Sequence, residues 1–361
     1  MKKNITLFVS AACILLTTSC VKEDHFGPTD GKKIKEFVLE EQAGNANIDN
    51  DAKTISITVS ADANIKFLKA TKIALSSFAT VKPAAGEPQD FTQPVTYTVT
   101  GEDGSTAVFK VTVSRQGGNP QIPNSDFNKW YTIANEYQGD EYQEIGENAN
   151  DKTWGTGNVG AAMMGLYPTK PQTISGNIAA SLTTTDMGAL AGFLGKQTAA
   201  GNLFTGFFDA SGPGGVITGK PAFGIPFRTT PNGFRVKYQY APGDIVRDGK
   251  GQVVPNMKDS CDIYVLLEHR EENKTKRLAT AWFRGGDVQT GWKTLDMPLV
   301  YGELPAGTPA YMLLKTGETW GDITKDKPTH ITVVFSASSR GDDFIGAWGS
   351  NLIVDDFELV Y

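Results

Sequence analysis

Cysteine and histidine are both scarce in this chain, which carries three of each in 361 residues. Two of the cysteines, Cys13 and Cys20, lie in the apolar N-terminal region, so Cys261 has no partner for a disulfide and is expected to pack as a small core residue. His269 lies eight residues from Cys261 on one predicted strand, roughly 27 Å away, which excludes a Cys–His dyad.

Clusters of basic residues and the common catalytic motifs are also absent. Lys and Arg number 34 against 40 Asp and Glu, giving a net charge of −6, and no basic cluster lines a predicted face. This balance argues against a nucleic-acid partner. The chain has no Gly-x-Ser-x-Gly elbow, no phosphate-binding Gly-Lys-Ser/Thr loop and no zinc-ligand spacing. Catalysis therefore has no positive support from motifs.

The N-terminal apolar run, Ile5–Leu16, is too short to span a bilayer stably, and it follows a positive start, Met1-Lys-Lys-Asn. The next residues, Leu16-Thr-Thr-Ser-Cys20, resemble the bacterial lipobox, in which the cysteine is acylated. This resemblance implies a signal peptide over residues 1–19, lipidation of Cys20 and a tether over residues 20–33. The alternative is an ordinary cleaved signal with a chance cysteine.

The residues after the lipobox predict where in the cell the protein is located. Val21-Lys-Glu-Asp24 resembles the export signal that sends lipoproteins of Bacteroidetes to the outer face of the outer membrane. The resemblance implies a lipid-anchored protein of the outer membrane that faces the cell exterior.

The remaining composition, with 39 Gly and 18 Pro, favours short strands joined by turns, and the predicted fold class is all-β. Residues 34–115 contain several alternating apolar and polar runs, with an Asp-Gly turn at Asp103-Gly104 that predicts a hairpin. We expect a small immunoglobulin-like β-sandwich. The stretch Asp90–Thr106 resembles immunoglobulin-like spacer modules of Bacteroidetes surface lipoproteins.

After a Gly- and Pro-containing linker, residues 122–361 are expected to form one larger domain. The predicted strands are Phe234–Tyr240, Asp262–His269, Lys293–Leu299, Tyr311–Lys315 and Ile331–Ala337, together with a closing strand over 351–361. One helix is predicted from Thr185 or Asp186 to about Gly195, with Met187, Leu190 and Leu194 on a shared face. A jelly-roll β-sandwich is the expected architecture.

Three segments of this domain carry a recognisable pattern: Gly201–Phe208, Phe223–Tyr240 and Asp259–Leu267. With Trp154–Asn158 and Val354–Leu359, they resemble the putative carbohydrate metabolism domain of gut Bacteroidetes lipoproteins. The resemblance implies a jelly roll similar to carbohydrate-binding modules, and it supports the fold more strongly than the function.

The closing strand contains one carboxylate, Asp355, on the face that is otherwise apolar or aromatic. The two-residue period places five of its side chains on one face: Ile353, Asp355, Phe357, Leu359 and Tyr361. In many carbohydrate-binding jelly rolls the opening and closing strands share a structural Ca²⁺, so Asp355 and Asp126 are the candidate metal ligands. The alternative is that Asp355 accepts hydrogen bonds from backbone N–H groups or hydroxyls.

A sugar-binding platform is the second candidate site. Several aromatic residues lie in or beside polar, Gly-rich stretches: Trp130, Tyr131, Trp154, Trp320 and Trp348. Exposed indoles suit the apolar face of a pyranose, and the pairs Trp154 with Asn158 and Trp348 with Asn351 also offer an amide. The alternative is that these indoles plug the ends of the sandwich. Trp282 and Trp292 flank a turn and are assigned to packing.

A third candidate, glycoside hydrolysis, requires two carboxylates across a cleft. Glu268 shares a predicted strand face with Tyr264 and Leu266, but no second acid lies on an equivalent face, and Glu268 is expected to be a solvated charge at a strand end.

The leading hypothesis is a surface lipoprotein that binds glycan for polysaccharide capture or utilisation, alongside other surface glycan-utilisation proteins. A glycoside hydrolase or lyase with an unrecognised acid pair, and an adhesin or fimbria-like surface protein, are the alternatives.

Overall fold

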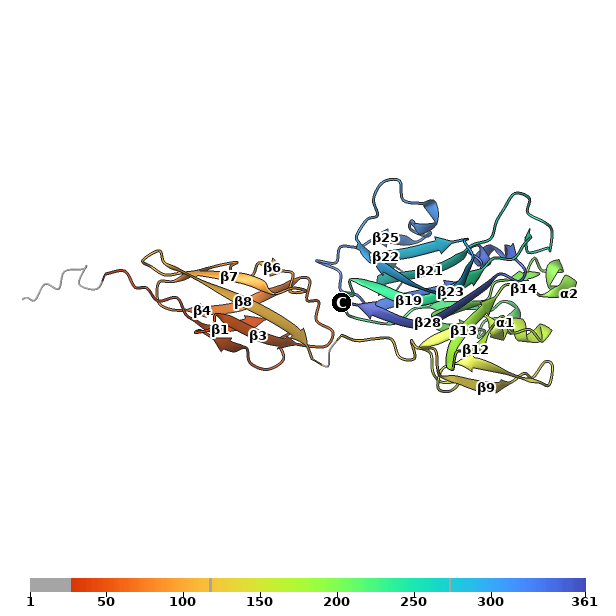
Figure 1. Ribbon diagram of the computed structural model, residues 1–361, viewed down its shortest axis with the longest axis horizontal. Coiled ribbons are helices and arrows are strands. Elements are labelled where there is room, and N and C mark those ends of the chain that lie inside the picture. Colours follow the sequence, from red (N-terminus) through yellow and green to blue (C-terminus); the bar gives the residue numbers. More distant parts are fainter. Residues whose placement is uncertain (1–26, 117–118, 273) are drawn as a thin grey trace, which may run out of the picture.

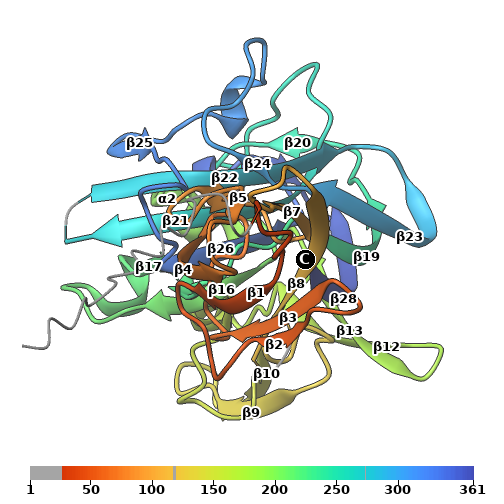
Figure 2. The same cartoon turned by 90° about the vertical axis from the view of Figure 1, so that its left-hand side faces the viewer.

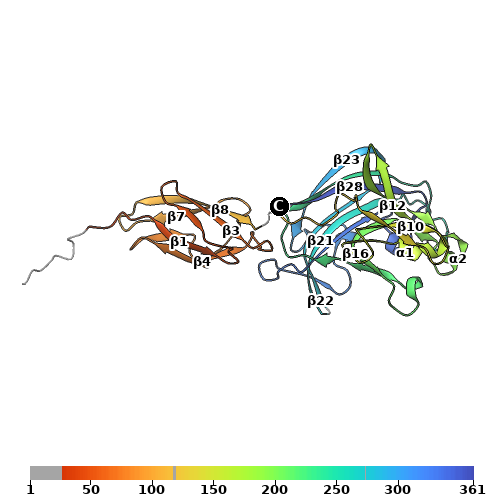
Figure 3. The same ribbon diagram turned by 90° about the horizontal axis from the view of Figure 1, so that it is seen from below.

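The computed structural model describes residues 27–116, 119–272 and 274–361. The predicted signal peptide, the lipidated Cys20 and the first part of the predicted tether lie outside the described residues. Within the described part of the chain, no helix is both long enough and apolar enough to cross a membrane. Two bodies of β-structure lie end to end, the smaller one N-terminal (Figures 1 and 3).

The small domain is a β-sandwich of two sheets, as predicted. A three-stranded sheet has the order β1-β4-β6, and a five-stranded sheet has the order β2-β3-β8-β7-β5. Phe37 of β1 meets Tyr97 of β7 edge to face at 5.0 Å, so the aromatic contact joins the two sheets across the core. The bounds are β1 (Ile34–Leu39), β2 (Asn47–Asp49), β3 (Thr54–Val59), β4 (Leu68–Leu75), β5 (Thr80–Lys82), β6 (Pro88–Gln89), β7 (Val95–Thr100) and β8 (Thr106–Arg115).

Strand β8 is central in its sheet. It pairs antiparallel with β7 through the predicted hairpin, where Gly104 takes the positive φ of +82° that the turn requires. On its other side β8 pairs parallel with β3, from Thr54 opposite Lys110 to Val59 opposite Arg115. Buried residues alternate with exposed ones along β8, as the period of a strand predicts.

The large domain is also a sandwich of two sheets. The first has nine strands, with the path β11-β16-β26-β21-β22-β24 and three short strands beside it, and the second has five, in the order β12-β13-β28-β19-β23. Phe335 of β26 and Phe357 of β28 meet at 5.9 Å, so the core lies between the sheets. Seen along the long axis, the β12–β13 hairpin projects beyond the outline of the small domain (Figure 2).

The strands of the nine-stranded sheet are β11 (Trp154–Thr156), β16 (Asn202–Asp209), β17 (Lys220–Phe223), β18 (Ile225–Pro226), β21 (Cys261–Glu271), β22 (Lys274–Gly285), β24 (Val300–Tyr301), β25 (Glu318–Trp320) and β26 (His330–Ser336). Those of the five-stranded sheet are β12 (Thr169–Ile174), β13 (Asn177–Thr183), β19 (Gly233–Ala241), β23 (Gln289–Pro298) and β28 (Asn351–Val360). Three further pairs join β9 (Trp130–Ala134) to β10 (Glu141–Ile145), β14 (Thr185–Asp186) to β15 (Thr198–Ala199), and β20 (Val246–Arg247) to β27 (Gly346–Ala347).

Helical segments are short. They are α1 (Asn158–Ala161), η1 (Ala162–Met164), α2 (Gly188–Phe193), η2 (Gly215–Ile217), η3 (Ala310–Met312) and η4 (Gly341–Asp343). The predicted helix corresponds to α2 but begins later, because Thr185 and Asp186 form strand β14. Of the three residues predicted to share a face, Met187 is buried, whereas Leu190 and Leu194 have exposed fractions of 68% and 61%. The predicted strand Tyr311–Lys315 was also wrong, because η3 and a turn occupy it.

The closing strand β28 contains a bulge that the period of two did not predict. Lys237 of β19 pairs with Asp355 and Arg235 pairs with Glu358, so two residues of β28 stand opposite one of β19. Asp356 has a positive φ of +48° at this point. The side chains that join the core are therefore Leu352 and Val354 before the bulge, but Phe357 and Leu359 after it. The prediction that Asp355 shares the face of Phe357 was wrong.

The two domains meet through a compact set of polar and aromatic contacts. Arg115, at the end of β8, lies over the ring of Tyr361 at 4.9 Å and donates from Nε to Ala63 O at 3.0 Å. The ammonium of Lys66 lies 4.0 Å from the centre of the Tyr301 ring. Both cations come from the small domain, and both rings belong to the large domain.

Candidate functional site

A large concavity lies on the outer face of the nine-stranded sheet and has a volume of about 1120 Å³. Its floor is formed by Phe204 of β16, Val334 of β26, Tyr264 of β21 and Trp282 of β22. These residues alternate along their strands with core residues such as Leu203, and they form an apolar cluster separate from the main core. One sheet thus carries apolar side chains on both faces.

Aromatic rings dominate the β21–β22 side of the cavity. The rings of Tyr264 and Trp282 are cross-strand neighbours and stack at 3.9 Å with an interplanar angle of 22°. Tyr311, in η3, meets Trp282 at 5.8 Å and 64°, and the guanidinium of Arg284 lies 3.8 Å from the Tyr311 ring centre. This arrangement joins flat apolar surfaces to a nearby cation.

A bidentate ion pair lies beside these rings. Arg284 donates from Nε and Nη2 to the two carboxylate oxygens of Asp262, both at 2.7 Å. Burial raises the pKa of Asp262, while the hydrogen bonds and the charge of Arg284 oppose this rise. Because Arg284 occupies one edge of both oxygens, the remaining lone pairs of the carboxylate are the ones that a ligand hydroxyl can reach.

The wall of the cavity comes from loops and short helices that follow the strands. Asp342 and Asp343 of η4 contribute carboxylates, and Lys315 and Arg340 contribute cations. Helix α2, together with α1, η1 and η2, supplies mostly aliphatic residues. The exposed fractions of Tyr264 and Trp282 are only 5% and 7%, so the floor is deep and poorly hydrated.

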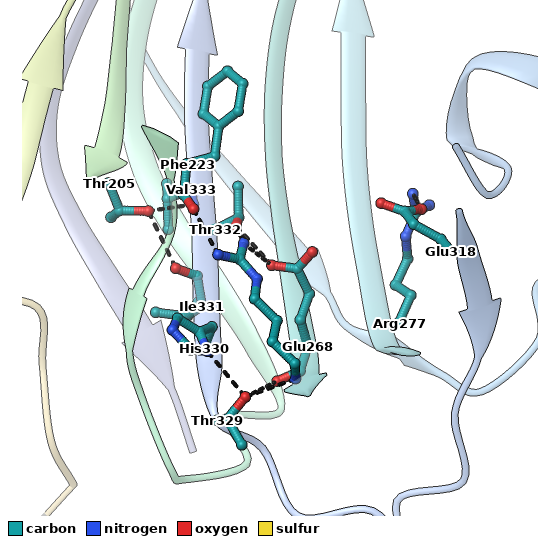
Figure 4. A network of polar contacts seen from close by, with 11 residues as sticks. Thr205, Phe223, Glu268, Arg277, Glu318, Thr329, His330, Ile331, Thr332 and Val333 are labelled. Atoms are coloured by element: carbon teal, nitrogen blue, oxygen red, sulfur yellow. Dashed lines mark hydrogen bonds and ion pairs between the residues drawn. The ribbon is translucent and has the colours of Figure 1, made fainter. Parts of the chain in front are cut away.

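Glu268 lies on the same face of β21 as Tyr264 but belongs to a different network (Figure 4). Its Oε2 accepts from Arg270 Nη2 at 2.6 Å and from Thr332 Oγ1 at 2.7 Å, and its exposed fraction is 4%. The prediction of a solvated charge was therefore wrong. Arg270 also donates to Phe223 O at 2.7 Å, so the network ties β21, β26 and β17 together. Glu268 is not among the residues that line the cavity.

Two of the predicted sugar-binding residues lie in the interior. Trp154 has an exposed fraction of 2%, donates from Nε1 to Pro123 O at 2.9 Å and meets Phe127 edge to face at 5.2 Å. Asn158 is fully buried, and its amide both donates to Thr169 O at 2.6 Å and accepts from Thr169 N at 2.9 Å. In this structure both side chains hold the sandwich together, and neither presents a face to a ligand.

The remaining predicted aromatic residues are half-buried and are divided among three separate segments, β9, β25 and the turn after β27. Trp130 is on β9, where its Nε1 donates to Phe127 O at 2.7 Å, and Tyr131 follows it on the same strand. Trp320 is on β25 with Arg277 at 5.7 Å, and Trp348 follows β27 with Arg247 at 4.5 Å. None of the four lines the cavity.

Asn351 begins β28, where its amide donates to Ser181 Oγ at 3.0 Å and Thr183 Oγ1 at 2.9 Å. These bonds occupy the amide that was predicted to bind a hydroxyl. Trp282, which sequence reasoning assigned to packing, is the tryptophan that lines the cavity. Trp282 alternates with Ala281 and Phe283 along β22, so its side chain points to the opposite face of the strand. This alternation is the sequence signal for Trp282, but the strand itself was not predicted.

The candidate metal ligands lie near the bulge of β28. The opening segment and the closing strand do come together, since Phe357 N donates to Ser125 O at 2.8 Å. Asp355 Oδ1 accepts a hydrogen bond from Asp356 N at 2.9 Å, and Asp126 Oδ2 accepts one from the side-chain amide of Asn128 at 2.8 Å. Lys237 forms an ion pair with Asp356 at 2.7 Å.

Burial, together with the charge of Asp356, raises the pKa of Asp355 to about 6. Within residues 27–116, 119–272 and 274–361 no group of three or more His, Cys, Asp or Glu side chains is arranged to hold a metal. Because Asp356 N donates to Asp355, Asn128 donates to Asp126 and Lys237 holds the neighbouring carboxylate of Asp356, the residues present fit a Ca²⁺ ion poorly, and a calcium site stays a prediction.

The fold and the site define a class: a two-sheet β-sandwich that carries a deep cavity on one outer sheet face. The family model for the "Putative carbohydrate metabolism domain" matches residues 126–360, and the chain belongs to this family. The model "SGBP, N-terminal", named for surface glycan-binding proteins, matches residues 34–113. Both matched domains are thus of carbohydrate-related families.

Two solved structures resemble this chain, one over nearly all of it and the other over about two thirds of it. A protein from Bacteroides thetaiotaomicron described as a putative glycoside hydrolase is 27% identical, with a TM-score of 0.51, over 92% of this chain and 98% of that one. A protein from Bacteroides vulgatus with the same description is 25% identical, with a TM-score of 0.50, over 65% of this chain and 96% of that one. No curated protein matches the chain.

Proposed function

We propose that this protein captures polysaccharide at the cell surface, and that the cavity on the nine-stranded sheet holds part of the glycan chain. The observation that carries the proposal is the combination of stacked aromatic rings with the Asp262–Arg284 pair on one cavity floor. Aromatic faces suit the C–H face of a sugar ring, and paired charges suit its hydroxyls. The two carbohydrate-related families support the same function.

Deep burial of the polar pair favours selective recognition. In a poorly hydrated site, a ligand that covers the pair without placing a hydroxyl on it leaves the remaining lone pairs of Asp262 without a hydrogen-bond donor, and the energetic penalty is larger than in water. The ring of Tyr311 is more accessible than the rings of the cavity floor, because η3 carries it on the wall and it is only half-buried. It therefore provides the face that a sugar ring can reach first.

The proposal is tested by glycan-array screening of the full chain, followed by calorimetry of each hit with matched variants. Tyr311→Ala is expected to weaken binding at least about tenfold, the loss of about 1.4 kcal/mol. Trp320→Ala, which removes a predicted platform residue outside the cavity, is expected to leave the affinity unchanged. If Trp320→Ala abolished binding and Tyr311→Ala had no effect, the site would not be this cavity.

Glycoside hydrolysis is the second candidate function, because the two solved relatives described as putative glycoside hydrolases share this architecture. The acids that line the cavity are Asp262, Asp342 and Asp343, and the negative charge of Asp342 helps to raise the pKa of Asp262, as a general acid requires. Against this role, both oxygens of Asp262 are held by Arg284 at 2.7 Å. We therefore favour binding without turnover.

Reducing-end assays on any bound polysaccharide separate the two functions. Binding without the release of new reducing ends supports the capture role. Steady release that disappears in both Asp262→Asn and Asp342→Asn, with binding retained, would establish a hydrolase instead. Glu268→Gln serves as the control, because Glu268 lies outside the cavity and its loss is expected to affect stability rather than turnover.

The proposed setting is the outer membrane, with the chain anchored through lipid on Cys20 and facing the cell exterior beside other glycan-utilisation proteins. The lipobox-like residues before Cys20 and the match of residues 34–113 to the surface glycan-binding family support this setting. Metabolic labelling with a fatty-acid analogue is expected to mark the wild-type chain but not Cys20→Ser. Protease added to intact cells is expected to degrade the protein; full protection would contradict surface exposure.

A further inference from the structure

The chemistry of the cavity changes from one side of the sheet to the other. Asp262, Arg284 and the stacked rings of Tyr264 and Trp282 lie on β21 and β22. Phe208 lies on β16, and β26 separates β16 from β21. With neighbouring strands about 4.8 Å apart, β21 is about 10 Å and β22 about 14 Å from β16. Beyond β16 the cavity is bounded by α1, η1, α2 and η2, which we call the aliphatic side.

The aliphatic side, like the aromatic side, is formed by closely packed side chains. Met187, which precedes α2, and Ala191 of α2 pack with Ala161 of α1 in a small buried cluster. The ring of Phe208 lies against Gly219, where an added Cβ would come within 2.4 Å of ring atom Cε1. A glycine is therefore needed at residue 219 to keep this ring in the wall.

The rim of the aliphatic side leaves large apolar side chains in contact with water. The exposed fractions are 68% for Leu190, 88% for Phe193, 61% for Leu194 and 47% for Ile217. All four line the cavity. Exposed apolar residues that gather at the mouth of a cavity, rather than being scattered singly, indicate a surface that is covered when a ligand is bound.

We infer that the ligand is an amphiphilic saccharide, whose sugar ring lies on the aromatic side while an acyl, alkyl or aryl substituent enters the aliphatic side. The inference rests on the proposed function and deepens it by naming the chemical class of the glycan. A single ligand can meet both sides because they line one continuous cavity. An unsubstituted glycan would leave the apolar rim in water.

Matched pairs of glycosides test the inference without knowledge of the natural sugar. Methyl and octyl β-glycosides of glucose, galactose and mannose are titrated into the full chain by calorimetry, below the micelle concentration of the octyl compounds. Each fully buried methylene strengthens binding about fourfold, so the octyl member of at least one pair is expected to bind at least about tenfold more tightly. Equal affinities within every pair would overturn the inference.

Two serine variants locate the effect. Leu190→Ser, in the exposed rim, is expected to weaken octyl-glycoside binding by a larger factor than methyl-glycoside binding, and so to reduce the octyl preference. Val288→Ser is the control, because Val288 is also 60% exposed but lies at the turn between β22 and β23, outside the cavity. An octyl preference that survives Leu190→Ser, or falls equally in Val288→Ser, would place the alkyl chain elsewhere and overturn the inference.

The same measurements separate failure of the inference from failure of the proposed function. If glycans bind and Tyr311→Ala weakens them, but octyl chains add nothing, the function stands and the inference fails. If octanoate alone binds as tightly as octyl glycosides and no glycan binds, the aliphatic side is a site for an apolar ligand only. In that case both the proposed function and the inference about saccharides fail.

Discussion

At the residue scale, Glu144 is the carboxyl group with the clearest thermodynamic signature. It lies on β10 with an exposed fraction of 4%, and its Oε1 accepts from Thr156 Oγ1 at 2.7 Å. Burial raises the pKa of Glu144 to about 7 from an ordinary value of 4.5. The folded chain therefore binds this proton more tightly than the unfolded chain does.

A dependence of stability on pH follows from this shift. The stabilising contribution of Glu144 is complete below pH 4.5 and is lost as the pH rises through about 7. Glu144→Gln cannot titrate, so denaturant unfolding of the two proteins is expected to diverge with pH, with the wild type losing on the order of 2–3 kcal/mol relative to the variant between pH 4 and pH 8. Parallel pH profiles would show that Glu144 has an ordinary pKa in the folded state.

Calcium removal is the matching test at Asp355. Since Lys237 and backbone donors already meet the carboxylates at the bulge, we expect the same Tm in millimolar Ca²⁺ and in EDTA. Differential scanning calorimetry gives the answer. A Tm that rises with Ca²⁺ in the wild type, and does not rise in Asp355→Asn, would establish the calcium site instead.

At the element scale, β28 shows what alternation predicts and what it misses. The period of two identified the strand and the burial of Phe357 and Leu359, but a bulge depends on the neighbouring strand and on the approach of Ser125, which sequence patterns do not contain. The register therefore shifts by one residue at Asp356, and Asp355 faces away from the core.

The bulge can be tested by substitution at Asp356, whose φ is +48°. Both Asp356→Gly and Asp356→Val remove the exposed ion pair with Lys237, so their difference isolates the backbone. The valine variant is expected to be less stable than the glycine variant by about 1–2 kcal/mol, because a β-branched side chain disfavours positive φ. Equal stabilities in urea unfolding would show that the bulge rearranges at no cost.

The candidate site was harder to predict than the fold, for a physical reason that Trp154 and Trp282 illustrate. Trp154 lies in a polar, Gly-rich sequence yet is buried, because Phe127 and Phe335 come from distant segments to cover it. Trp282 lies in an apolar strand yet lines the cavity, because its sheet is apolar on both faces. The local sequence predicts that a strand forms. Whether a side chain of that strand is buried or lines a cavity depends on which other segments pack against each face.

At the scale of the whole molecule, the domain contact is expected to hold the two sandwiches as one body. Tyr361 receives Arg115 on its ring, and its hydroxyl donates to Pro120 O at 2.7 Å. A further bond joins Thr230 Oγ1 to Asn64 Oδ1 at 2.9 Å. These contacts surround the linker, so the relative orientation of the domains does not depend on the linker alone.

Tyr361→Ala is expected to release this contact and let the domains tumble separately. Small-angle scattering should show a broader distribution of distances, and backbone relaxation by nuclear magnetic resonance should give the small domain a shorter correlation time than in the wild type. Tyr137→Ala, at a residue that is 56% exposed, is the control for loss of a tyrosine. Unchanged relaxation in Tyr361→Ala would mean that the remaining contacts suffice.

The central position of β8 has a mechanical consequence. At the hairpin end of the small domain, Thr29 N donates a hydrogen bond to Glu102 Oε2. At the other end, Arg115 Nε donates to Ala63 O. Tension along the long axis of the molecule therefore pulls β8 along its own length. Because β8 is bonded on one side to β3 and on the other to β7, such tension loads many hydrogen bonds in shear at once rather than opening them one by one. The small domain is therefore suited to resist a pull exerted along the long axis of the molecule.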